Sequence, residues 1–376
     1  MPRTIPGDEM QLPDAFLVRL RSLLGDSYQA WLDSCRDDPV YGLRVNTLKV
    51  TAEDFQTQVS WNLESISWCD DGMYIDPEIR AGRHLYHAAG LYYLQGPSAM
   101  AAVEALDVQP GQWLLDISGS PDGKSTQIAA RLGGSGVLVA NDPGAGRVRP
   151  LGEYLERCAV RNVVITNAPA RASSTYMAGA FDRGLVDAPC SGEGLFRKSP
   201  SARCEWSEAH VDRSANRPHL LLDDIAGSSK PRGLLVYSTC TFNKEENESQ
   251  IWQFLDRHPD WTLEPIAEPA LAIRQPSTAS PYPEDQQNAG MARIWLHNDR
   301  GDGHFVALLR ASVESEAPVS TSRRTDHWRI RSAQLVPSEW SEFRASLLQD
   351  SRSAAPSFGR GITFSNHHLP CLWTFR

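Results

Sequence analysis

The sequence lacks any CxxC pair and any apolar run near the roughly 20 residues that a membrane-spanning helix needs. Its seven cysteines are an odd number, scattered along the chain. This pattern predicts reduced thiols in a cytoplasmic protein, because a disulfide framework uses paired, regularly spaced cysteines. The first residues, MPRTIPGDEMQLP, lack the apolar segment of a secretory signal, so we expect neither export nor membrane insertion.

Positive charge is also scarce. The formal net charge of −9 argues against bulk attraction to nucleic acid, although it is compatible with a local basic stripe. A length of 376 residues is enough for two or three domains, and 41% hydrophobic with 22% charged residues is ordinary for a soluble globular protein. We find no internal repeat, and we expect a monomer.

Strand and helix patterns alternate after residue 111. Apolar runs predict strands at 112–118, 136–142, 162–167, 181–189 and 232–240, and amphipathic stretches predict helices at 123–133, 147–160, 219–229 and 247–259. The alternation predicts an α/β fold with a doubly wound, mostly parallel, Rossmann-like sheet. Residues 291–310 predict a hairpin that adds an antiparallel strand. Pro150 suits its helix only in the first turn.

The pattern divides the chain into four parts. Residues 1–85 predict a small N-terminal α/β domain, with a helix at 14–35, a strand at 41–50 and a short helix capped by residues 51–54. Residues 86–312 form the doubly wound domain, 313–326 a polar linker, and 327–376 a small C-terminal segment.

The stretch LLDISGSPDGKST (114–126) predicts a strand, a loop of small residues and a helix start, which suits a cofactor bound by backbone N–H groups. A triphosphate-binding loop would need glycine at position 118, where Ser118 stands. The next strand ends in Asp142, where an acid can hold ribose hydroxyls. These features favour an adenosine-type cofactor, while a triphosphate site and a structural loop without ligand stay open.

Two cysteines follow apolar strands, in DAPCSGEG (187–194) and YSTCTFNKEENE (237–248). Cys190 and Cys240 would lie at the carboxyl edge of the sheet, where such folds bind ligands. The cysteines lack metal-ligand spacing, so we expect no metal site. Two buried small side chains are the plain alternative, but polar loops beside a cofactor pocket favour nucleophilic thiols.

One chemistry needs a thiolate and a methyl-donating adenosine cofactor together. Carbon 5 of a pyrimidine is too electron-poor to attack a methylsulfonium, but thiolate addition to carbon 6 makes an enamine that can. A base then removes the proton from carbon 5 and the thiol is eliminated. Asp187, three residues before Cys190, is placed to aid the addition at the edge of the base.

Six stretches carry a resemblance to a known family: LRVNTLK, AAGLYYLQGPSAM, DISGSPDGKSTQIAA, DAPCSGEGLFRK, YSTCTFNKEENE and GDGHFVALLR. They span roughly residues 14–310, and they resemble the RNA cytosine-5 methyltransferases of the Nol1/Nop2/Sun type, closest to the bacterial branch acting on small-subunit ribosomal RNA. The resemblance implies a class I methyltransferase fold, S-adenosylmethionine as cofactor, and RNA, here small-subunit ribosomal RNA, as partner.

The resemblance also implies roles for single residues. Cys240 would be the nucleophile, Cys190 would assist release of the methylated RNA, and Asp187 would contact the cytosine edge. The N-terminal domain would contact RNA, and the C-terminal segment would be a partial RNA-binding domain. The residues implied at the S-adenosylmethionine pocket are Asp116, Gly119, Pro121, Gly123, Lys124, Asp142 and Asp187.

Some residues depart from the family pattern on the cofactor side. Asp122 stands where the family has glycine, and Pro169 where it places an aspartate for the adenine amino group. These departures motivate a second hypothesis, an RNA-binding relative with a decayed cofactor pocket. Residues 244–248, KEENE, predict a solvated helix start, and Arg197 with Lys198 are either phosphate contacts or plain surface residues.

Overall fold

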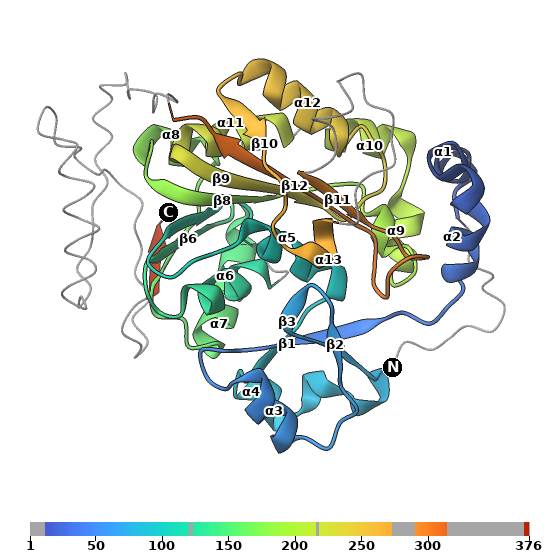
Figure 1. Cartoon of the computed structure of the whole chain (residues 1–376), viewed down its shortest axis with the longest axis horizontal. Helices are drawn as coiled ribbons and strands as arrows, with labels where there is room; N and C mark the ends of the chain where they lie inside the picture. The colour runs from blue at the N-terminus through green and yellow to red at the C-terminus, as the bar shows by residue number, and fades with distance from the viewer. Residues whose placement is uncertain (1–11, 120–122, 216–217, 273–289, 314–371, 376) are drawn as a thin grey trace, which may run out of the picture.

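The computed structural model describes residues 12–119, 123–215, 218–272, 290–313 and 372–375, which form two sheets with helices around them (Figure 1). Within these residues a four-stranded sheet has the order β2-β3-β1-β4. A nine-stranded sheet has the order β10-β12-β9-β8-β5-β6-β7-β13, with β11 paired to β12. All but the first residue of the linker predicted at 313–326, and all of the predicted C-terminal segment except 372–375, lie outside the described residues.

The small sheet is built from β1 (Tyr41–Val45), β2 (Glu64–Ile66), β3 (Cys69–Ile75) and β4 (Tyr92–Leu94). The strand predicted at 41–50 ends at Val45, because a turn follows in which the N–H groups of Lys49 and Val50 both donate to the Asn46 carbonyl. The cap predicted at Thr51 is confirmed, since its hydroxyl accepts the Asp54 N–H at the start of α3 (Ala52–Gln58). The sheet continues beyond residue 85, because β4 pairs with β1.

The helix predicted at 14–35 is two helices, α1 (Asp14–Leu24) and α2 (Tyr28–Ser34). They separate at Gly25, whose positive φ of 53° ends α1. Both helices lie away from the small sheet and against the larger domain (Figure 1). There Phe16 and Trp31 join a buried aromatic cluster with three partners, Phe196, Trp206 and Phe242.

The large sheet confirms the predicted doubly wound, mostly parallel α/β fold. Its parallel strands are β5 (Trp113–Asp116), β6 (Val137–Asn141), β7 (Val163–Thr166), β8 (Phe181–Asp187), β9 (Ser229–Thr239) and β13 (Leu372–Phe375). Its antiparallel strands are β10 (Trp261–Leu263), β11 (Met291–Ile294) and β12 (His304–Ala311). The predicted hairpin is therefore present as β11 and β12.

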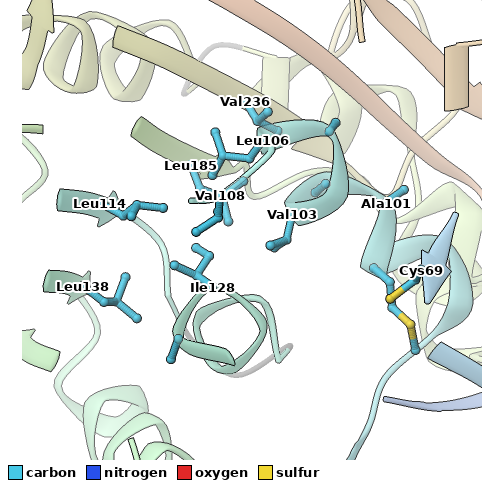
Figure 2. Close-up of a cluster of buried hydrophobic side chains, with 14 of the residues drawn as sticks. Cys69, Ala101, Val103, Leu106, Val108, Leu114, Ile128, Leu138, Leu185 and Val236 are labelled. Carbon is cyan, nitrogen blue, oxygen red and sulfur yellow. The ribbon is translucent and has the colours of Figure 1, made fainter. Parts of the chain in front are cut away.

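Helices cover both faces of this sheet. Alternate strand residues face opposite ways, so Leu114 and Leu138 pack with α5 (Pro97–Leu106) and α6 (Lys124–Leu132) on one face (Figure 2). Leu115 and Val139 belong to the core on the other face, under α11 (Pro218–Ser228) and α12 (Glu248–Arg257).

The remaining helices are short or lie at the edges. On the face of α5 and α6, α7 (Ala145–Arg157) begins earlier than predicted and holds Pro150 in its interior rather than in its first turn. The sequence did not predict α4 (Leu85–Ala88), α8 (Arg171–Tyr176), α9 (Pro200–Glu205), α10 (Glu208–Ala215) or α13 (Pro269–Ala272). Within the described part of the chain, no helix combines the length and apolar character needed to cross a bilayer.

The strand order reverses between β5 and β8. From β5 the chain moves outward through β6 and β7, then returns to place β8 on the other side of β5. Ligands of doubly wound sheets bind beyond the carboxyl ends of the strands at such a reversal. The carboxyl ends of β5, β6, β8 and β9 therefore define where a site is expected.

A buried arginine joins the small sheet to this region. Arg44 of β1 is 1% exposed and donates from Nε to Gln95 Oε1 at 2.9 Å and from Nη2 to Thr126 Oγ1 at 2.8 Å. It also reaches the Gly123 carbonyl, at the N-cap of α6. The small sheet thus holds the start of α6 through a buried charge.

Replacing this arginine tests the connection between the two sheets. We expect Arg44→Met to lower the free energy of unfolding by about 2–4 kcal/mol, since it strands buried acceptors. Arg149→Met is the control, because the Arg149 side chain is 87% exposed, and it should change stability by less than about 0.5 kcal/mol. Equal urea midpoints for the two variants would contradict a buried connection at Arg44.

Candidate active site

Two cysteine loops meet at the carboxyl edge of the large sheet. We call residues 188–198, after β8, the first cysteine loop, and residues 240–247, after β9, the second. Because β8 and β9 run parallel with Asp187 opposite Ser238, the loops leave the sheet side by side. They bring Cys190 Sγ to 3.3 Å from Cys240 Sγ, and both half-buried residues are free thiols.

The surroundings of Cys190 disfavour its thiolate form. The hydrogen bond with Cys240 and removal from solvent raise the pKa of the Cys190 thiol well above its ordinary value. A thiol with such a pKa stays protonated at neutral pH. The two sulfurs lie within hydrogen-bond distance, and either thiol can act as the donor.

Asp187 lies at the end of β8 between two donors. Its Oδ2 is 3.0 Å from Lys124 Nζ, and its Oδ1 accepts the Ser238 hydroxyl at 2.8 Å. Lys124 is only 3% exposed, and an ammonium this buried needs a carboxylate partner. The predicted residues Lys124, Asp187 and the two cysteines therefore stand around the ends of β5, β8 and β9.

The loop after β5 is held tightly around Asp116. Asp116 is 1% exposed and accepts the Ser125 hydroxyl at 2.5 Å. A Cβ on Gly119 would lie 2.8 Å from that hydroxyl oxygen, and a Cβ on Gly123, whose φ is 89°, would lie 2.6 Å from the Tyr93 ring. Both positions therefore need glycine.

Pro121, predicted at the pocket, and Asp122, a departure from the family pattern, lie outside the described residues.

Asp142 directly follows β6, next to the loop after β5. Its Oδ1 accepts the Gly144 N–H at 2.7 Å and Arg147 Nε at 2.9 Å, and Asp142 is 1% exposed. The neighbouring Asn141 carbonyl accepts the Gly119 N–H at 2.7 Å. The strand-end acid and the glycine loop, predicted together, therefore do lie side by side.

The sequence prediction for KEENE is wrong at its centre. Glu246 is 0% exposed, and Glu248 is 6% exposed and paired with buried Arg293. Lys244 and Glu245 are exposed as expected, and the Glu245 side chain is 55% exposed. Burial raises the pKa of Glu246 to about 7, against the lowering effect of hydrogen bonds from Ser191 and Asn243.

Arg197 and Lys198, the basic residues of the first cysteine loop, do not form an exposed pair. Arg197 is 8% exposed and donates to the backbone carbonyls of Ser34 and Gly301. Lys198 binds Asp302 Oδ2 at 2.6 Å. Arg197 thus serves packing, a role that its position in the sequence did not predict.

One group of possible metal ligands lies elsewhere. Cys69, Asp71 and Glu104 bring their ligand atoms within 4.8 Å of one another. The Arg131 guanidinium binds Asp71 at 2.7 Å and Glu104 at 2.5 Å. This arginine supplies the positive charge that the two carboxylates need, between the small sheet and α5.

Comparison with known proteins agrees with this architecture. The family model described as 16S rRNA methyltransferase RsmB/F matches residues 103–310, and the model of the N-terminal domain of 16S rRNA methyltransferase RsmF matches residues 12–97. The chain is 39% identical over 316 residues to ribosomal RNA small subunit methyltransferase F of Enterobacter sp. (strain 638), covering 81% of this chain and 64% of that protein. The namesake from Serratia proteamaculans (strain 568) is 36% identical over 310 residues, covering 80% and 63%.

A solved structure supports the fold over most of the described chain. The methyltransferase homolog protein from Pyrococcus horikoshii superposes with a TM-score of 0.69 at 26% identity, covering 80% of this chain and 96% of that one. The chain itself spans less than two thirds of the length of the two curated relatives above.

The buried carboxyl of Glu246 gives stability a defined pH dependence. Its pKa rises from 4.5 to about 7 on folding, so its contribution to stability is full below pH 4.5 and is lost as the pH rises through 7. We expect the free energy of unfolding of the native chain, minus that of Glu246→Gln, to fall by about 2–3 kcal/mol between roughly pH 5 and pH 8. Urea unfolding across this range measures it, and a pH-independent difference would refute it.

Proposed function

Since the chain belongs to the RsmB/F family of 16S rRNA methyltransferases, we propose that it methylates carbon 5 of a cytosine in small-subunit ribosomal RNA through a covalent cysteine adduct. The methyl donor is S-adenosylmethionine. The proposal places the protein in the cytoplasm, where thiols stay reduced. The observation that carries it is the 3.3 Å approach of the Cys190 and Cys240 sulfurs at the reversal of the strand order.

The raised pKa of the Cys190 thiol disfavours Cys190 as the attacking thiolate, which supports Cys240 as the nucleophile. The Cys240 sulfur lies 3.3 Å from that of Cys190, at the same strand ends as Asp187. The Cys240 thiolate adds to carbon 6 of the cytosine, so that a C–S bond forms and an electron pair moves to carbon 5. Asp187 contacts the edge of the base and is held for this by Lys124 and Ser238.

S-adenosylmethionine, when bound, supplies an electrophilic methyl group to carbon 5. Afterwards a base takes the proton from carbon 5, the C–H electron pair re-forms the ring double bond, and Cys240 leaves carbon 6 as a thiolate with the electrons of the C–S bond. Cys190 is placed to assist this release, because its sulfur lies beside the one that leaves. The N-terminal domain contributes to binding of the RNA.

The described residues fit this cofactor by their chemistry. Asp142 already accepts two hydrogen bonds on one oxygen, and a carboxylate offers about four acceptor sites, which leaves capacity for ribose hydroxyls. Asp116, Gly119 and Gly123 line the cofactor pocket. A side chain on Gly119 would collide with Ser125, and one on Gly123 would collide with Tyr93. Lys124 and the N-terminus of α6 suit the carboxylate of the methionine part.

Trapping on RNA tests the adduct. With small-subunit ribosomal RNA carrying 5-fluorocytidine, whose carbon 5 holds no removable proton, we expect the native chain to form a covalent complex that survives denaturing electrophoresis. Cys240→Ala should form none. Cys190→Ala should accumulate a complex even on unmodified RNA, because attack remains while release fails.

Cys204→Ala is the matched control, because Cys204 is an exposed free thiol outside both cysteine loops. It should behave like the native chain in each assay. An adduct that persists in Cys240→Ala would overturn the assignment of the nucleophile, and no adduct in any variant would count against cytosine-5 chemistry.

Calorimetry separates the enzyme from a relative with a decayed cofactor pocket, the alternative that Pro169 motivates. We expect S-adenosylmethionine to bind with a dissociation constant on the order of micromolar, and Asp142→Asn to weaken it about tenfold or more. Glu153→Gln, at a side chain 60% exposed on α7, should leave affinity unchanged. Absence of binding at millimolar ligand would favour the decayed relative.

A further inference from the structure

Each cysteine loop carries a buried glutamate whose carboxylate accepts hydrogen bonds from the backbone of the other loop. Glu193 of the first loop is 2% exposed, and its Oε2 accepts the backbone N–H groups of Phe242 and Asn243, both at 3.0 Å, from the second loop. Its other oxygen accepts the Trp206 indole N–H at 3.0 Å. Both carboxylate oxygens of Glu193 are therefore occupied, and one of them fixes the backbone just beyond Cys240.

Glu246 makes the reverse connection. It belongs to the second loop, and its Oε2 accepts the Ser191 N–H of the first loop at 2.8 Å. Its Oε1 accepts a hydrogen bond from the Asn243 side-chain amide. The same amide lies 2.9 Å from Thr241 Oγ1, which in turn is 2.8 Å from Ser191 Oγ. Glu246 thus fixes the residue directly after Cys190.

A buried carboxylate is costly unless hydrogen bonds replace its water. Neither Glu193 nor Glu246 has a salt-bridge partner among those found in the described residues, and both are compensated mainly by N–H donors. Backbone donors have fixed positions, so such bonds define geometry more narrowly than a pair of flexible side chains would. The arrangement therefore favours precise placement of the two loops over stability.

Packing supports the same alignment of the loops. The Gly194 N–H donates to the Cys240 carbonyl at 2.9 Å. A Cβ on Gly194 would lie 2.4 Å from the Gly303 carbonyl oxygen, so the first loop is pressed against the turn before β12. On the other side the Phe242 ring stacks on Trp295 with centroids 4.9 Å apart.

We infer that Glu193 and Glu246 are positioning residues, a reciprocal clamp that keeps the Cys190 and Cys240 sulfurs within reach of each other during the reaction. The inference rests on the proposed function for its catalytic meaning. Attack on the base needs only Cys240, whereas release needs Cys190 beside it. Loosening the clamp therefore impairs release more than attack.

Isosteric amides give a graded test above pH 7, where the Glu246 side chain is a carboxylate. Glu246→Gln must place an NH₂ group against either the Ser191 N–H or the Asn243 amide, so it breaks the clamp. Glu193→Gln can keep its oxygen on both backbone N–H groups and loses only Trp206, so it should be milder. Glu245→Gln is the matched control, because Glu245 is the exposed neighbour of Glu246.

The first readout is the covalent complex on unmodified cytosine RNA. We expect Glu246→Gln to lower turnover about tenfold or more through misplacement of a thiol, while the trapped fraction of enzyme rises. Glu193→Gln should show a smaller rise, and Glu245→Gln none. Lower turnover without accumulated complex in a variant that melts like the native chain would overturn the inference, because a general loss of structure slows attack and release together.

The second readout needs no RNA. Diamide takes two electrons and two protons from neighbouring thiols, forming a disulfide and a hydrazine, at a rate that follows their effective concentration. We expect disulfide formation between Cys190 and Cys240 to be on the order of tenfold slower in Glu246→Gln than in the native chain or Glu245→Gln. Cys204→Ala in every variant removes the one thiol that is exposed among the described residues and could compete.

The two readouts separate the two ideas. If the native chain forms no adduct with RNA but Glu246→Gln still slows the disulfide, the proposed function fails and the clamp stands. If the native chain forms its adduct while Glu246→Gln matches it in both assays, the clamp fails and the proposed function stands.

Discussion

The parallel pairing of β8 with β9 is the constraint on which the site depends. Strands that run parallel end at the same edge, so a register with Asp187 opposite Ser238 delivers both cysteine loops to one place. A shift by one residue would turn every side chain of a strand to the other face of the sheet. Apolar packing on both faces of the sheet resists that shift, which makes the core the first determinant of the distance between the two sulfurs.

Beyond the strand ends, polar interactions take over from packing. Lys124 joins the loop after β5 to β8 through Asp187, and Ser118 donates its hydroxyl to the Asp187 carbonyl at 2.8 Å. The two cysteine loops are joined by the carboxylates of Glu193 and Glu246. Asp187 thus contacts both the loop after β5 and the strand that precedes Cys240. A substitution in either of these segments would displace Asp187, which is proposed to contact the base.

The sequence predicted the main sheet well because buried parallel strands are continuous apolar runs. It also predicted the position of both cysteines and Asp142 at the carboxyl edge of this sheet, because each follows such a run. It could not predict the clamp. The residue types of Glu246 and its neighbours are those of a solvated helix start. Their burial depends on the first cysteine loop, about fifty positions earlier in the sequence. Arg44 was likewise hidden, since only the three-dimensional structure shows that β1 reaches α6. The short helices α9 and α10 follow no periodic pattern long enough to detect.

The N-terminal helices have a consequence for how the protein can be divided. Phe16 and Trp31 cover rings that belong to the region of the cysteine loops, among them Phe196 and Phe242. A fragment with the large sheet but without the first forty residues or so would expose these rings to water as an apolar patch. Such a fragment would tend to self-associate, so the helices act as a built-in solubilising cover for the domain they precede.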